Sequence, residues 1–259
     1  MTNDKLMFRW IKRIVLVFTL VFFGWLVFEF ITFPKISWLR GNNPQTTSMI
    51  EARKKEDKAN GEQPKQTQTW VPLEKISVNL QRAVLAGEDA NFATHHGFDW
   101  DAINKAWEEA EKRAEEEAKQ EGDNDPSSWI PAMPDFKRGA STITQQLAKN
   151  LYLSEERSFV RKGREAVITY FIERELSKKR ILEIYLNVIE WGDGIYGAEA
   201  ASRYYFNKSA DALSAQDAAF LSAIIPSPNN VFNPKKNPKR VARRQRIILR
   251  GMNYVKLPD

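Results

Sequence analysis

The stretch GASTITQQLAKN (139–150) is the segment around which the fold and the chemistry are predicted. A helix capped by Ser141 would carry four polar residues at the i, i+3, i+4, i+7 spacing of one face, namely Thr142, Gln145, Gln146 and Lys149. A second face would bury Ile143, Leu147 and Leu151. No carboxylate neutralises the lysine, which favours a ligand rich in hydroxyls and phosphate oxygens. Spacing alone leaves open a solvated helix face.

Length and composition limit the possible domain organisation, partners and metal sites. The 259 residues can form one large domain or two small ones, and 42% hydrophobic residues are enough for a sizeable core. A net charge of +6 permits contact with an anionic surface without indicating nucleic acid as a partner. The absence of cysteine excludes disulfides and thiolate metal sites, and the only histidines are the adjacent His95 and His96.

The N-terminal segment predicts a membrane anchor. Residues 14–33 are almost entirely apolar, and about 20 such residues span a bilayer. Four cations precede them, so the positive-inside rule places the tail, residues 1–13, in the cytoplasm. A cleaved signal peptide is the alternative, but the apolar run is long and no small-x-small cleavage pattern follows it. We therefore expect a retained transmembrane helix, with all later residues outside the cytoplasm.

The chain beyond the anchor divides by composition. Residues 34–69 are mainly polar and are expected to form a polar tether. Residues 70–259 show helical periodicity without βαβ alternation, which predicts one mainly helical domain. Within it, residues 108–136 begin with a run of Glu, Lys and Ala and are expected to be an insertion.

Two glutamates lie on otherwise apolar helical stripes. Glu88 continues the stripe of Leu80 and Val84, where a charged carboxylate must be paired, raised in pKa or facing a cleft. It is therefore a candidate general base, with a structural ion pair as the alternative. Glu165 shares a face with Ile168 and Ile172 and is a second inward carboxylate.

Basic residues cluster near the second glutamate and again at the C-terminus. The first cluster could bind a polyanionic group near Lys149 or could simply aid solubility; its members are Arg157, Arg161, Lys162 and Arg164. The second cluster lies on a predicted terminal helix, residues 241–252, and comprises Arg243, Arg244, Arg246 and Arg250. Either a solvated face or attraction to anionic lipid headgroups accounts for it.

Five blocks of residues occur in a fixed order between about residues 70 and 252. They are ED-x-x-F-x-x-H-x-G-x-D at 88–99, GASTITQQLAKN at 139–150, RK-x-x-E at 161–165, K-x-x-ILE-x-YLN at 178–187, and a last block from Gly194 to Lys208. Together they resemble the peptidoglycan glycosyltransferase family, the transglycosylase module of bifunctional penicillin-binding proteins. Because the chain lacks the length for a transpeptidase domain, it resembles the monofunctional biosynthetic transglycosylases.

The resemblance implies a fold and a reaction. The expected fold is all-α and lysozyme-like, with a small membrane-associated jaw. The implied reaction polymerises lipid II into glycan strands with inversion and releases undecaprenyl pyrophosphate. The implied catalytic residues are Glu88 and Glu165, and either could hold a divalent cation, Mg²⁺ or Mn²⁺. The implied partners are lipid II, the growing glycan chain and membrane lipid, with cell-wall synthesis or division proteins left open and no nucleic acid.

The resemblance also assigns supporting residues. Substrate binding falls to Asp89, Phe92, Ser141, Thr142, Gln145, Gln146, Lys149, Asn150, Arg157, Arg161 and Lys162. A structural role falls to His95, Gly97, Glu183, Tyr185 and Asn187. The implied location is the bacterial inner membrane, with the catalytic domain in the periplasm. Two rival functions remain: a lysozyme-like hydrolase, which needs no basic cluster, and a membrane scaffold, which would leave the two inward glutamates unexplained.

Overall fold

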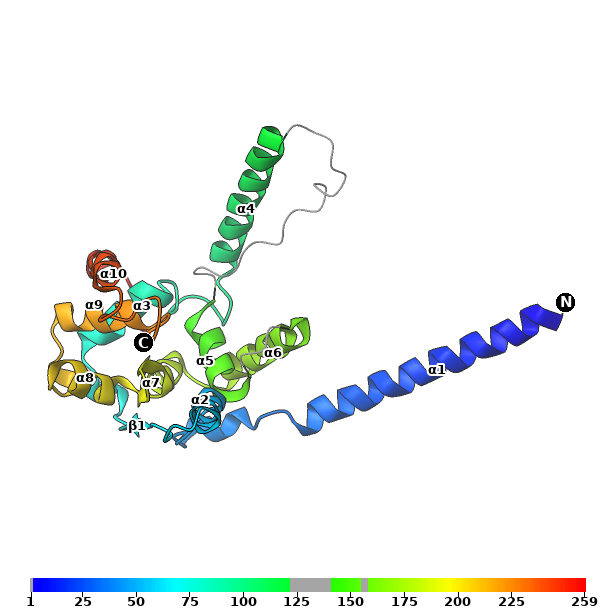
Figure 1. Cartoon of the computed structure of the whole chain (residues 1–259), viewed down its shortest axis with the longest axis horizontal. Coiled ribbons are helices and arrows are strands. Elements are labelled where there is room, and N and C mark those ends of the chain that lie inside the picture. The colour runs from blue at the N-terminus through cyan, green and yellow to red at the C-terminus, as the bar shows by residue number, and fades with distance from the viewer. Residues whose placement is uncertain (1, 122–140, 155–157) are drawn as a thin grey trace. The chain divides into compact units, whose positions relative to one another are not determined.

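The computed structural model describes residues 2–121, 141–154 and 158–259 and contains two compact units, residues 1–35 and 36–259 (Figure 1). The first unit consists mainly of helix α1 (Thr2–Ile31), whose apolar side chains are exposed, with Phe18 at 71%. Among the described residues, it is the one helix long and apolar enough to cross a membrane. The helix begins earlier than the predicted span of 14–33 and ends two residues before it.

The second unit is mainly helical, as predicted. Its α-helices are α2 (Ser48–Ala59), α3 (Val78–Glu88), α4 (Trp100–Glu121), α5 (Ile143–Tyr152), α6 (Phe159–Glu175), α7 (Lys178–Val188), α8 (Ala198–Phe206), α9 (Ala215–Ile224) and α10 (Pro238–Gly251). Short 3-10 turns are η1 (Ile36–Arg40), η2 (Leu73–Lys75) and η4 (Ala210–Ala212). A small sheet has the order β1 (Thr67–Gln68), β3 (Ile195–Tyr196), β2 (Glu190–Gly192), with β1 parallel and β2 antiparallel to β3.

Two helical groups build the core. Helix α3 packs against α9 and α10, and α5 packs against α6 and α7. The stripe predicted on α3 is confirmed, because Leu80 and Val84 are both fully buried. Burial of such a side chain contributes about 1.5–3 kcal/mol. The last residue of this helix is Glu88, so the packing of α3 fixes where that carboxylate lies.

The prediction of a tether at residues 34–69 is wrong. This segment forms η1, α2 and β1, and it buries Ile36, Leu39 and Ile50. Helix α2 packs against α5, where the Ser48 hydroxyl donates to the Leu151 carbonyl at 3.0 Å. The polar composition reflects the solvent-facing side of α2, because a few well-placed apolar residues are enough to dock a short helix.

Candidate active site

Glu88 is held by two helices that are distant from it in sequence. One carboxylate oxygen accepts a hydrogen bond from Nη2 of Arg244 on α10 at 2.8 Å, and the other accepts from Nε2 of Gln146 on α5 at 2.9 Å. Only 8% of the Glu88 side chain is exposed. Burial raises the pKa of Glu88, and the positive charge of Arg244 and the two hydrogen bonds oppose that rise. A carboxylate whose pKa is raised is a stronger base than an exposed one, as a general base requires.

The amide of Gln146 is oriented by a buried phenol. Tyr185 on α7 donates to Oε1 of Gln146 at 2.8 Å, which leaves Nε2 to face Glu88. Burial raises the pKa of Tyr185 well above its ordinary value, so its hydroxyl stays a donor. Gln146 and Tyr185 also line a cavity of about 230 Å³, which Lys149 and Asn150 border as well. Gln146, the hydrogen-bond partner of the candidate base Glu88, therefore borders a space that can hold a ligand.

Two residues predicted to bind substrate instead build the start of α5. The N-cap is Thr142 rather than Ser141, and Thr142 forms a capping box with Gln145. Both are buried, with 3% and 7% exposure. The Thr142 hydroxyl also donates to the Gly97 carbonyl at 2.7 Å. The predicted polar face is thus reduced to Gln146 and Lys149, because Thr142 and Gln145 are buried and form the helix cap.

Asp89, predicted to bind substrate, joins the first two sequence blocks. Its carboxylate accepts from the backbone N–H of Ile143 at 2.8 Å and lies 2.9 Å from Nε2 of His95. The backbone N–H of Gly97 donates to Nδ1 of that ring at 3.1 Å, which makes Nε2 the donor to Asp89. Gly97 has a φ of +89°, and a Cβ there would lie 2.9 Å from Thr169. This assembly positions α5 beside Glu88.

The remaining motif residues are mostly structural. Phe92, predicted to bind substrate, is fully buried beneath the Lys178 ammonium, 4.4 Å from its ring centroid. Asn187 pairs with both backbone groups of Val71 at 2.9 Å. Glu183 pairs with Arg180. The structural assignments of His95, Gly97, Glu183 and Asn187 fit these contacts, whereas Tyr185 also reaches the site.

Glu165 lies in a cluster formed within its own helix. Its carboxylate is buried on α6 and pairs with Arg161 at 2.8 Å and with Lys162. The Nε of Arg161 is buried and has no hydrogen-bond partner in the described part of the chain. Both partners of the Glu165 carboxylate, Arg161 and Lys162, lie on α6, which packs against α5. Arg157 lies outside the described residues.

Neither glutamate is arranged as a metal ligand. The described residues contain no group of three or more His, Asp or Glu side chains that could hold a metal ion. Both oxygens of Glu165 face cations, and Glu88 faces Arg244. A cation bound there would have to displace a positive side chain, so these donors do not fit the divalent metal that the resemblance left open.

Comparison with known proteins shows the family of this chain. A sequence model of the transglycosylase family matches residues 55–122 and 129–253. The chain belongs to the transglycosylase family. The gap in the match, 123–128, falls inside the segment predicted as an insertion, which stays a prediction. The mainly helical second unit is accordingly the lysozyme-like transglycosylase domain.

Three relatives are named biosynthetic peptidoglycan transglycosylase. The protein of Thiobacillus denitrificans is 42% identical over 98% of this chain and 99% of its own length. That of Chromobacterium violaceum is 44% identical over 86% and 89%, and that of Bordetella avium is 39% identical over 96% and 97%. This transglycosylase chain thus matches these relatives over nearly their whole length.

Arg244 is the site residue that the sequence did not reveal. In the sequence it is one of four arginines on the predicted terminal helix, which either a solvated face or contact with lipid headgroups explains. In the transglycosylase domain its Nη2 bonds both the Gly87 carbonyl and Glu88 at 2.8 Å, and it lies over the Phe232 ring. Its position one turn after the buried Val241 would have been the only available signal, since α10 is otherwise rich in arginine.

Proposed function

We propose that this chain polymerises lipid II into peptidoglycan glycan strands. The reaction joins the sugar 4-hydroxyl of one lipid II to the anomeric carbon of the growing chain and releases undecaprenyl pyrophosphate with inversion. The transglycosylase match and the names of the relatives support this activity. The mechanism rests on one observation: Gln146 and Arg244 each donate a hydrogen bond to one oxygen of the buried carboxylate of Glu88.

In this mechanism Glu88 is the general base. Its carboxylate takes the proton of the attacking 4-hydroxyl as the new carbon–oxygen bond forms. Gln146 and Arg244 use both oxygens of the carboxylate, so its orientation is fixed before substrate arrives. Desolvation raises the pKa of the Glu88 carboxylate and makes it a stronger base, and the guanidinium charge of Arg244 limits that rise.

The leaving group takes the electron pair of the broken anomeric carbon–oxygen bond. Its pyrophosphate needs positive charge, which we assign to Lys149, Arg161 and Lys162. In the described residues Lys149 has no carboxylate partner, and it lines the cavity next to Gln146. Glu165 pairs with Arg161 and Lys162 and holds both cations on α6.

The apolar helix α1 suits a lipid-linked substrate, because an anchor keeps the enzyme at the membrane surface. We propose a single span with a cytoplasmic N-terminus and a periplasmic catalytic domain. Lys5, Arg9, Lys12 and Arg13 precede the span and support this orientation.

The test is polymer synthesis by detergent-solubilised full-length protein from fluorescent lipid II. We expect a ladder of glycan products that lysozyme digests. A protein that makes no polymer but releases sugars from purified cell wall would be a hydrolase instead. A protein inactive in both assays would leave only a scaffold role and would overturn the proposal.

A further inference from the structure

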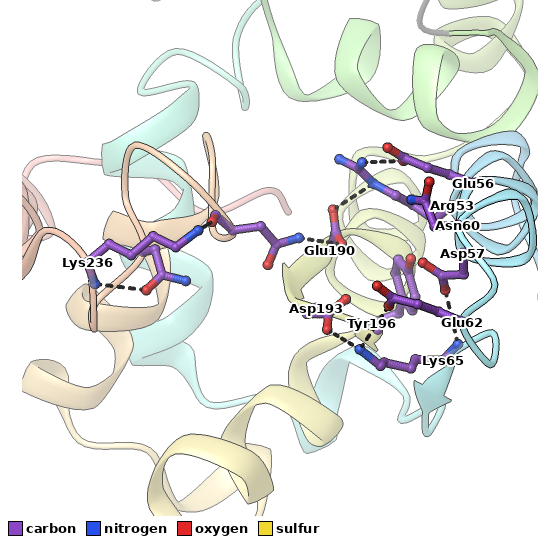
Figure 2. A pocket seen from close by; sticks show the side chains of 13 residues that line it. Arg53, Glu56, Asp57, Asn60, Glu62, Lys65, Glu190, Asp193, Tyr196 and Lys236 are labelled. Atoms are coloured by element: carbon purple, nitrogen blue, oxygen red, sulfur yellow. Dashed lines mark hydrogen bonds and ion pairs between the residues drawn. The ribbon is translucent and has the colours of Figure 1, made fainter.

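A second chamber lies beyond the cavity next to Lys149. It has a volume of about 360 Å³ and is bordered by α2, the turn between β2 and β3, and the loop before α10. Figure 2 shows Asp57, Glu62 and Lys65 on one side of this chamber and Lys236 on the other. Its volume falls within the range of about 300–1,000 Å³ that is typical of ligand sites.

The two spaces share a wall. Arg53, Glu190 and Tyr196 line both the chamber and the smaller cavity that Lys149 and Gln146 border. A chain-like ligand that lies along Lys149 therefore meets the chamber next, without leaving the surface of the domain. This continuity indicates an extended site rather than two separate ones.

The lining matches a hydroxyl-rich ligand with charges of both signs. Five carboxylates, three cations and three asparagine amides border the chamber, together with Tyr196. Amides and carboxylates bind sugar hydroxyls and ammonium groups, and lysine or arginine binds carboxylates. A glycan strand carrying peptides combines all of these groups, whereas an apolar lipid chain offers none of them.

An ion pair and a hydrogen bond connect the segments that form the walls of the chamber. Lys65 pairs with Asp193 at 2.6 Å, and Asn229 donates to Glu190 at 2.9 Å. Gly194 has a φ of +70°, and a Cβ there would lie 2.4 Å from the Cβ of Lys65, so the turn fits closely against the segment after α2. A preorganised chamber loses little entropy on binding.

We infer that this chamber binds the part of the growing glycan strand that lies beyond the reacting sugars, including its peptides. This inference rests on the proposed function. It predicts that the chamber affects strand length without affecting the first coupling. In the first coupling the donor is a single lipid II with one disaccharide, and we expect only the longer strand formed in later couplings to reach the chamber.

The test compares two chamber variants with a matched control. Asn60→Trp fills the chamber from the end of α2, and Lys65→Ala with Asp193→Ala removes an ion pair without changing net charge. As the control, Glu51→Ala with Lys54→Ala removes an ion pair on α2 whose two residues line neither cavity. Each protein is given fluorescent lipid II, and both the first-coupling rate and the final strand length are measured.

We expect both chamber variants to make strands about five- to tenfold shorter, the scale of one or two lost hydrogen bonds. Their first-coupling rate and the strand length of the control should match wild type. Unchanged strand length in the two chamber variants, or equal shortening in the control, would overturn the inference and leave the proposed function standing. A wild-type protein that makes no polymer would instead overturn the proposed function, and this inference with it.

Discussion

Glu88 and Glu165 are both buried glutamates on helices, yet their partners come from different places. Glu88 is bonded by Gln146 and Arg244, which are 58 and 156 residues away in sequence. Glu165 is paired with Arg161 and Lys162, one turn earlier on the same helix. The first arrangement exists only in the folded domain, whereas the second forms wherever α6 forms.

This difference suggests different chemical roles. Burial raises the pKa of Glu88, which has one cationic neighbour, and a base needs this property. Glu165 lies between two cations that would otherwise repel each other, and its contribution is to hold them for a phosphate. Four substitutions test whether the two glutamates differ in this way.

The largest expected effect is that of Glu88→Gln. Loss of a general base should lower polymerisation by about 10²–10⁴-fold, because the amide cannot take the proton of the hydroxyl. The amide has the same shape, so thermal unfolding should show an intact fold. Turnover is measured with labelled lipid II. Near-normal turnover would remove Glu88 from the role of base.

The next effect is that of Glu165→Gln. We expect turnover to fall roughly 10- to 100-fold, the scale of a lost hydrogen bond to a charged group, about 1.5–3 kcal/mol. Affinity for the lipid pyrophosphate should weaken as well, because Arg161 and Lys162 lose the carboxylate that holds them. Glu175→Gln on the same helix is the control. Unchanged pyrophosphate binding by Glu165→Gln would contradict the assigned role.

Arg244→Gln should act through the pKa of Glu88. Without the guanidinium charge that pKa rises further, so a larger fraction of the base is protonated and the acidic limb of kcat/KM moves to higher pH. Activity near pH 7 falls and partly recovers at higher pH.

Arg243→Gln, exposed on the same helix, should leave the profile unchanged. A uniform loss at every pH would indicate a purely structural role for Arg244. The charged groups facing Glu88 are Arg244 and Asp89, with Tyr185 neutral.

Tyr185→Phe should have the smallest effect. It frees the Gln146 amide to rotate, and the lost hydrogen bond is worth about 0.5–1.5 kcal/mol, or roughly two- to tenfold in turnover. The exposed Tyr170→Phe is the control. A loss as large as that of Glu88→Gln would mean that Tyr185 contacts substrate directly.

Several elements could be predicted from the chain alone. The stripe of Leu80, Val84 and Glu88 and the inward direction of Glu165 follow from helical periodicity, and the structure confirms their burial. The predicted cap at Ser141 was one residue early. Ser141 and Thr142 can both cap a helix, but only Thr142 has a glutamine, Gln145, three residues later to complete a capping box, and its hydroxyl also bonds the Gly97 carbonyl.

The sequence by itself determined the apolar first helix, the helical character of the domain, and the two glutamates with the cations beside Glu165. These depend on spacing within one helix, and a 3.6-residue period is visible in any chain. Only the tertiary structure decided that Arg244 bonds Glu88, that Asp89 bonds the start of α5, and that residues 34–69 fold to form part of the second chamber. Those outcomes depend on which distant surfaces pack together, and the local spacing of residues along the chain does not specify that packing.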